Sequence, residues 1–240
     1  MTLTSLPADL GTTLAVWAHP DDETYLAGGL LAALREAGQR VVCVTATRGE
    51  AGNGLDAGGT QADRSSLART RTTELNGALE VLGVVEHRWL DYQDTRCMDV
   101  DVEEPVDRLL RILTEVRPDT VVSFGPDGFT GHRDHRAVAH WAQLAVERCR
   151  PSPRLLQAVA TQRDLDAGRD VDERFDVYAE GSPPAVDEED LAVRLVLEGQ
   201  ERTRKVAALR RQSSQTAELV AAIGIERFSR WVSTESFREA

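Results

Sequence analysis

Residues 13–23 read TLAVWAHPDDE, and this stretch decides the fold. The apolar run from Leu14 to Ala18 is short and ends abruptly at polar residues, which is typical of a buried strand. A helical pattern follows at once from Glu23. The polar residues that begin at His19 are therefore predicted to lie at the carboxyl end of a strand, the edge at which open α/β sheets bind their ligands.

The polar residues of this segment are chemically reactive. His19 supplies an imidazole, and Asp21 and Asp22 supply adjacent carboxylates that must point in different directions. Pro20 stiffens the turn between them. This combination suits a divalent metal with one open coordination position. The acidic residues would equally favour the first turn of a helix through capping and the helix dipole, so the segment alone leaves both interpretations open.

A second polar segment favours the metal site. Residues 125–135 read GPDGFTGHRDH and follow the strand-like run 120–124. This segment contributes His132, Asp134 and His135, and its two histidines are three residues apart, so they face roughly the same way on a nascent helix. Three of the five histidines lie in the two segments. A parallel sheet would bring both segments to one edge.

Length, charge and cysteine usage narrow the class of protein. The 240 residues predict a single α/β domain over 1–240. A net charge of -12 disfavours nucleic acids and anionic membranes as partners. The three cysteines show no CxxC spacing, so neither a disulfide framework nor a thiolate zinc site is expected. No signal-peptide pattern or transmembrane-length run occurs, and we expect a cytoplasmic protein.

Strands and helices alternate along the first two thirds of the chain. We expect strands at 13–18, 41–46, 86–90, 120–124 and 155–161, and helices at 23–37, 62–82, 103–116 and 134–148. This alternation predicts a Rossmann-like, doubly wound three-layer sandwich with a mostly parallel central sheet.

The last third of the chain is expected to add to this core of residues 13–161. Residues 162–190 are acidic and weakly periodic, so we expect an excursion beyond the sheet, with an edge strand as one alternative. A strand at 191–197 and an amphipathic helix at 198–211 follow. The tail, residues 223–240, is predicted to be a docked helix.

Two further polar residues, Arg48 and Asp94, lie where a ligand could reach them. Arg48 follows the second strand, in front of a glycine-rich loop that could cover a substrate, although a simple ion pair with Glu50 is equally consistent with the sequence. Asp94 follows the third strand and could face the same cleft. Arg71 and Glu74 lie one helical turn apart, which is typical of a surface pair.

The two polar segments together resemble the LmbE/PIG-L family of metal-dependent N-deacetylases, which includes the deacetylases of mycothiol biosynthesis. The resemblance extends to about residue 215, through TRGE at 47–50, RTTE at 71–74, Asp94 and KVAAL at 205–209. It implies a Rossmann-like fold and hydrolysis of the acetamide of an N-acetylglucosaminyl group. Some members of that family cleave related amides such as mycothiol conjugates.

The resemblance also implies a zinc site. His19, Asp22 and His135 match the ligands of the family, although another first-row divalent metal would suit the same donors. Zinc lowers the pKa of a bound water to about 7. Asp21 matches the general base that would take the proton from this water.

Further positions match residues that act on the substrate. His132 corresponds to the second catalytic histidine, which would stabilise the oxyanion, with Asp134 oriented to it. Arg71 and Asp94 match positions that commonly contact the sugar, and Arg48 is a further candidate substrate contact.

The chain departs from the family at one place, and several functions stay open. The family often has a histidine in a pattern like HxSQ, whereas residues 212–215 here read QSSQ, which leaves contacts around Gln212 undecided. The expected partner is a small amino-sugar substrate, with homo-oligomer formation open. The alternatives are a zinc-dependent amidase on a thiol-sugar conjugate or another amide, and a non-catalytic sugar-binding module. A nucleotide-binding protein is disfavoured, because the chain has no glycine fingerprint.

Overall fold

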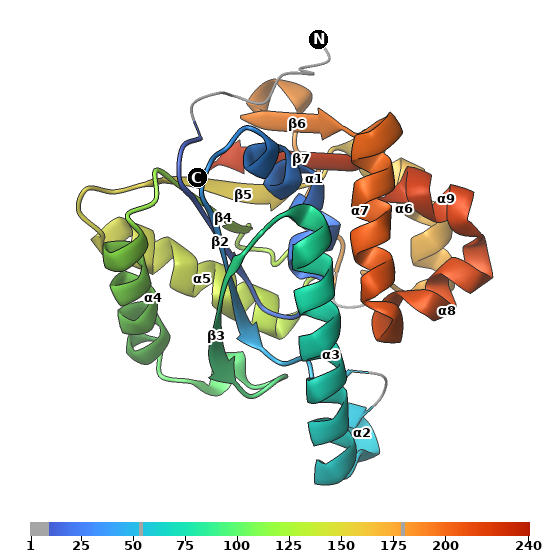
Figure 1. Cartoon of the computed structure of the whole chain (residues 1–240), viewed down its shortest axis with the longest axis horizontal. Coiled ribbons are helices and arrows are strands. Elements are labelled where there is room, and N and C mark those ends of the chain that lie inside the picture. Colours follow the sequence, from blue (N-terminus) through green and yellow to red (C-terminus); the bar gives the residue numbers. More distant parts are fainter. Residues whose placement is uncertain (1–9, 53–54, 179–180) are drawn as a thin grey trace.

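The computed structural model describes residues 10–52, 55–178 and 181–240, and within them a single seven-stranded sheet organises the chain (Figure 1). The strand order is β3-β2-β1-β4-β5-β7-β6. The strands are β1 (Thr13–Trp17), β2 (Val41–Thr47), β3 (Glu86–Tyr92), β4 (Thr120–Phe124), β5 (Arg154–Val159), β6 (Val193–Val196) and β7 (Thr234–Glu239).

Helices cover both faces of this sheet. On one face α1, α3 and α7 pack against one another, and on the other α4 packs on α5 (Figure 1). The helices are α1 (Asp22–Glu36), α2 (Leu55–Gly58), α3 (Gln61–Leu82), α4 (Glu103–Val116), α5 (Arg133–Arg148), α6 (Gln162–Phe175), α7 (Gly199–Arg211), α8 (Ser213–Ile223) and α9 (Ile225–Trp231). In the described part of the chain, no helix is both long and apolar enough to cross a membrane.

The sheet is parallel from β3 to β5, as the alternation of strands and helices predicted. β1 pairs in parallel with both β2 and β4, and every residue of these three strands is buried. Such continuous apolar burial is expected where helices cover both faces. The chain winds outward from β1 to β3 and then returns to β4 beside β1. The strand order therefore reverses between β1 and β4, where open α/β sheets form their ligand crevice.

Residues 162–190 contain a helix that was not predicted, because α6 occupies the first half of this excursion from the sheet. A capping box begins this helix: Thr161 Oγ1 accepts from the Asp164 N–H, and the Asp164 carboxylate accepts from the Thr161 N–H. Only Gly168 and Val171 of α6 are buried, which explains its weak apolar periodicity. The edge-strand alternative reduces to an isolated bridge at Ala185 among the residues described here.

The predicted helix at 223–240 is correct only for its first part. The segment begins as α9 but ends as β7, which pairs antiparallel with both β5 and β6. The strand was not predicted because its sequence, TESFRE, is mostly polar, although β7 lies between two other strands. The buried Glu235 carboxylate is compensated there by Lys205 Nζ at 2.6 Å and by the N–H groups of Gly29 and Leu30.

Candidate active site

The first polar segment forms a sharp turn between β1 and α1. Asp21 lies at the N-cap of α1 with a φ of 104°, a backbone conformation that costs energy in a residue with a side chain. The turn is held by two hydrogen bonds: the His19 N–H donates to Asp22 Oδ2 at 2.7 Å, and the Asp21 N–H donates to Glu23 Oε2 at 3.0 Å. The two neighbouring aspartates are thereby directed to different partners.

The second polar segment delivers its histidines from the start of α5. His132 is the N-cap, and its Nδ1 accepts from the Asp134 N–H at 3.2 Å. His135 follows in the first turn, where its Nδ1 lies 2.9 Å from the Gly128 carbonyl oxygen. A Cβ on Gly128 would lie 2.9 Å from the Cβ of His135, so this close approach requires glycine.

The three predicted ligands converge. His19 Nδ1 lies 3.1 Å from His135 Nε2 and 3.6 Å from Asp22 Oδ2, and His135 Nε2 lies 3.3 Å from Asp22 Oδ1. Donor atoms bound tetrahedrally at zinc distances of about 2.0–2.1 Å are separated by about 3.3 Å. The observed separations are close to those between zinc ligands. Because the two Asp22 distances involve different oxygens, a rotation of the carboxylate would present one oxygen to the ion.

The outward-facing nitrogens of both imidazoles also suit a metal site. His135 Nδ1 faces the Gly128 carbonyl, which fixes the proton on Nδ1 and leaves the lone pair of Nε2 directed at Asp22 and His19. His19 Nε2 lies 3.0 Å from Asp94 Oδ1 and 3.4 Å from Asp134 Oδ2. Carboxylates and carbonyls behind metal-binding histidines orient the rings and set their tautomers.

The charges of the cluster favour a bound cation. Burial alone would lower the pKa of His19, but the three surrounding carboxylates raise it well above its usual value. Burial would raise the pKa of Asp22, but the two histidines lower it to about 2. Burial also lowers the pKa of His135 to about 4. The cluster thus already stabilises one positive charge, in the place where a metal ion would carry two.

Two other groups of donors overlap with this set. The ligand atoms of His19, His132 and His135 lie within 4.8 Å of one another, and so do those of His19, Asp94 and Asp134. His19 belongs to every combination. The described residues therefore place five other predicted site residues, Asp22, Asp94, His132, Asp134 and His135, around the His19 imidazole.

Asp21 lies beside this cluster and faces a buried arginine. Arg71 Nη2 lies 3.2 Å from Asp21 Oδ2, and the same guanidinium donates to the carbonyls of Gly49 and Pro20. Arg71 is only 5% exposed. Burial raises the pKa of Asp21 to about 7, against the opposing charge of Arg71. The interpretation of Arg71 as one half of a surface pair with Glu74 is wrong, since Glu74 accepts from Ser213 and Ser214.

The remaining predicted contacts divide into two groups. Asp94 lies with the cluster, where it accepts from the Ala51 N–H at 2.8 Å, and Glu50 accepts from the Asp94 N–H. Arg48 instead pairs with Asp91 at 2.7 Å and stacks on Trp89. The ion pair expected for Arg48 is therefore present, but with a different partner.

The Asp134 carboxylate contacts more than the sequence indicated. It accepts from the N–H groups of Thr95 and Cys97, at 2.7 and 3.1 Å, and faces His19. The residue contacts His132 through its backbone N–H. Asp134 thus fastens the chain after β3 to the start of α5.

The support beneath Asp21 was not predicted from the sequence. Glu23 is fully buried, and its Oε1 accepts from Gln212 Nε2 at 2.7 Å. Because Glu23 Oε2 accepts from the Asp21 N–H, Gln212 acts on the turn through one intermediate side chain. The departure from the HxSQ pattern therefore lies directly behind the site. A glutamate in the first turn of α1 is an ordinary capping residue by sequence, so only the fold reveals this role.

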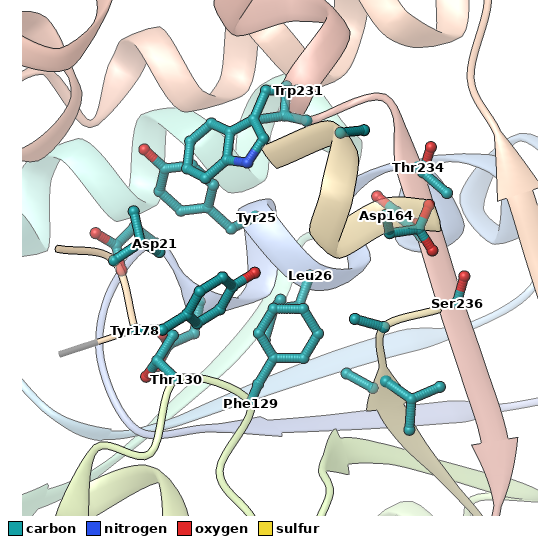
Figure 2. Close-up of a pocket in the computed structure, with 18 of the residues that line it drawn as sticks. Asp21, Tyr25, Leu26, Phe129, Thr130, Asp164, Tyr178, Trp231, Thr234 and Ser236 are labelled. Atoms are coloured by element: carbon teal, nitrogen blue, oxygen red, sulfur yellow. The ribbon is translucent and has the colours of Figure 1, made fainter. Parts of the chain in front are cut away.

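A cavity of about 330 Å³ opens beside the cluster. Asp21, Asp22 and His135 line one end of it. Its other walls come from α1, α6, α9, β5, β7 and the loop that carries Phe129, with Tyr25, Phe129, Tyr178 and Trp231 as aromatic lining (Figure 2). Tyr25, Tyr178 and Trp231 were not predicted to line a pocket.

A doubly wound sheet with a His/Asp centre at its switch point, open to a cavity, defines an α/β protein built for chemistry on a small ligand. The chain belongs to the PIG-L family, described as GlcNAc-PI de-N-acetylase, whose family model matches residues 14–146. The match includes both polar segments. It confirms the resemblance to this family.

Curated relatives share this assignment. A 1D-myo-inositol 2-acetamido-2-deoxy-alpha-D-glucopyranoside deacetylase of Saccharomonospora viridis is 35% identical, with 84% of each chain covered. A protein of the same name from Kineococcus radiotolerans is 39% identical over 150 residues, which cover 52% of this chain and 42% of that protein. The chain thus spans less than half the length of the Kineococcus relative.

Solved structures show the same fold. The N,N'-diacetylchitobiose deacetylase from Pyrococcus horikoshii superposes with a TM-score of 0.64 at 21% sequence identity, covering 98% of this chain and 87% of the other. At that identity the likeness concerns the fold, and it confirms the predicted three-layer architecture.

Proposed function

We propose that this chain hydrolyses the N-acetyl group of a small N-acetylglucosaminyl substrate, releasing acetate and the free amino sugar. The observation that carries the proposal is the convergence of His19, Asp22 and His135 beside the Asp21 carboxylate, at one end of a cavity. The names of the curated relatives, which act on an N-acetylglucosaminyl inositol, support this substrate class.

Zinc is the proposed cofactor, held by His19, Asp22 and His135. The donor set and the 3.1–3.6 Å separations between its atoms support this choice, and another first-row divalent metal would use the same donors. When bound, such a cation supplies a Lewis acid for the amide carbonyl and lowers the pKa of a coordinated water.

Asp21 is the proposed general base. Its pKa of about 7, raised by burial, suits a group that accepts a proton from water and returns it to the leaving amine near neutral pH. The strained turn directs its carboxylate toward Arg71, so Asp21 stays free while Asp22 binds the metal.

His132 is proposed to stabilise the developing oxyanion. Because its Nδ1 accepts from the Asp134 N–H, the ring hydrogen is on Nε2, which can donate to a carbonyl oxygen that gains charge. Its position at the N-terminus of α5 adds the favourable end of a helix dipole. Asp134 would keep His132 in place by anchoring this end of α5.

The substrate contacts of Arg71, Asp94 and Arg48 stay predictions. Arg71 and Asp94 border the cluster and would meet sugar hydroxyls beside the metal, whereas Arg48 would have to leave Asp91. We also propose that residues 162–240 belong to one domain with the core of residues 13–161, because β7 pairs with β5 in the same sheet.

Acetate release tests this function. The purified protein is incubated with methyl N-acetylglucosaminide and with the inositol glycoside, in the presence of zinc or after chelation. We expect metal-dependent release, and we expect Asp21→Asn to retain the metal while losing about 10²–10⁴-fold in kcat. Asp166→Asn, an exposed carboxylate on α6, is the matched control. Near-normal turnover by Asp21→Asn would refute the assignment of the base.

A further inference from the structure

The cavity beside the site is walled mainly by aromatic and aliphatic side chains. Tyr25 and Trp231 lie on one side of it, and Phe129 and Tyr178 lie on the other, with Leu26 between them (Figure 2). The rings support one another: the centroids of Tyr25 and Trp231 are 5.9 Å apart, and those of Phe129 and Tyr178 are 6.4 Å apart. Walls of this kind bind flat or aliphatic groups.

The Trp231 indole is held in place from behind. A Cβ on Gly168 would lie 2.9 Å from Trp231 Nε1, so the indole packs directly on the backbone of α6. Phe228 contacts the same ring from α9, with centroids 6.1 Å apart. The aromatic wall is therefore formed before any ligand arrives, which reduces the entropy lost on binding.

The carboxylates at the far end of the cavity are already engaged by the protein. Both oxygens of Asp164 accept from Arg194, at 2.9 and 3.0 Å, and Arg194 also donates to Ser236 Oγ. Glu235 is satisfied by Lys205 and by two N–H groups of α1. A polyol placed here would find these carboxylates already hydrogen-bonded, so it would recover fewer of the hydrogen bonds that it loses to water.

The charges of the lining disfavour an anionic group. Among the described residues that line the cavity, Asp21, Asp22, Asp164 and Glu235 carry carboxylates, and Arg230 is the one arginine. A ligand carboxylate placed here would face these four carboxylates and a single arginine, so its approach is less favourable than that of a neutral group. A neutral apolar group would lose no hydrogen bonds to water and would not be repelled by these carboxylates.

We propose that this cavity binds an apolar, preferably aromatic, aglycone attached to the amino sugar. The inference rests on the proposed function, because in N-deacetylation the acyl side of the amide is only a methyl group. The group that could occupy about 330 Å³ beside Asp21 and His135 then lies on the amine side, which consists of the sugar and its aglycone. The chain would thus act on an aryl or alkyl N-acetylglucosaminide in preference to a polyol or dicarboxylate conjugate.

Two measurements test the inference separately from the function. The first is kcat/KM for acetate release from phenyl, methyl and inositol N-acetylglucosaminides by the zinc-loaded protein. The second is the calorimetric affinity for the corresponding amines, phenyl and methyl glucosaminide, which requires no turnover. We expect the phenyl compound to exceed the methyl compound by roughly 10-fold to 100-fold in both.

Variants test which side chains cause the preference for the phenyl group. Trp231→Ala and, as a second variant on another segment, Tyr178→Ala should each reduce the phenyl-to-methyl ratio by about fivefold or more. Phe175→Ala removes an aromatic ring from the end of α6 that does not line the cavity, and it should keep the ratio.

The outcomes distinguish the two ideas. Acetate release with equal values for phenyl and methyl glycosides would overturn the aglycone assignment and leave the deacetylase function intact. Phenyl binding that depends on Trp231, without acetate release from any glycoside, would support the aromatic pocket and overturn the function. A preference for N-octanoyl over N-acetyl methyl glucosaminide that disappears in Trp231→Ala would assign the cavity to an acyl chain and refute the proposal.

Discussion

Lys205 of α7 and Glu235 of β7 form a buried ion pair, and its removal should destabilise the protein strongly. Both side chains are at most 1% exposed, and Lys205 Nζ lies 2.6 Å from Glu235 Oε1. Lys205 also donates to the Tyr25 carbonyl at 2.7 Å, while Glu235 accepts from the N–H groups of Gly29 and Leu30. The pair therefore joins α7 and β7 to the middle of α1, the helix that begins at the site.

The magnitude follows from what each substitution leaves behind. Lys205→Met leaves a buried carboxylate with two N–H donors but without its cation. Glu235→Gln leaves a buried ammonium with one carbonyl. Breaking a buried pair from either side costs about 3–5 kcal/mol in the free energy of unfolding, because one charge is left uncompensated. The double variant leaves no buried charge, so its cost should be smaller than the sum of the two by about 2 kcal/mol or more.

Urea denaturation of the wild type, the two single variants and the double variant measures this coupling. Glu36→Gln, which removes the exposed partner of Arg204, is the matched control and should change the free energy of unfolding by less than about 1 kcal/mol. Single variants that each cost under 1 kcal/mol, or a double variant whose cost equals the sum, would refute the reasoning.

Three further predictions concern the site and its surroundings. Gln212→Leu removes the amide donor to the buried Glu23 carboxylate, so it should lower the free energy of unfolding, measured with urea, by about 1.5–3 kcal/mol and lower kcat without loss of metal. Gln212→His keeps a donor and should restore both the stability and kcat. Equal behaviour of the two variants would contradict a supporting role for the Gln212 amide. His19→Ala should lose bound zinc in elemental analysis, and stoichiometric zinc in that variant would exclude His19 as a ligand. Burial, assisted by Arg48, lowers the pKa of His87 to about 4, so below pH 6.5 the unfolded chain takes up a proton that the folded chain does not, and stability falls from pH 6.5 toward 4. His87→Gln should narrow the gap between urea midpoints at pH 7.5 and 5, and an unchanged gap would argue against this contribution.

The parallel half of the fold was predictable because its sequence carries strong local signals. Runs such as 120–124 are apolar throughout and end at polar residues, and every residue of β4 is buried, as a strand covered on both faces requires. There are physical reasons why α6 and β7 were not predicted. α6 lies on the surface, so its apolar stripe is weak, and its start is marked only by Thr161 and Asp164. β7 buries a glutamate whose compensating lysine is 30 residues away in the chain.

The candidate site was predictable to the extent that its chemistry lies within contiguous segments. His19, Asp22 and His135 converge because the ends of β1 and β4 are neighbours in a parallel sheet. Arg71 was harder to place, since an arginine and a glutamate one turn apart usually form a surface pair, and nothing local indicates that the helix buries Arg71 against the turn at Pro20. The aromatic cavity could not be predicted, because its walls come from segments that meet only after β7 enters the sheet.

The division between these two parts indicates how substrate specificity can change in such a fold. The groups proposed to bind metal and move protons come from β1, α1 and α5, whereas most of the cavity wall comes from α6, α9 and β7. The two parts meet at α1, whose first turn holds the site and whose next turn carries Tyr25 and Leu26 into the cavity. Substitutions in α6 or α9 can therefore reshape the pocket without touching a metal donor, while substitutions at Lys205 or Glu235 disturb both through α1. Because function depends on the site rather than on the fold, relatives with one chemistry can diverge in substrate through changes in α6, α9 and β7.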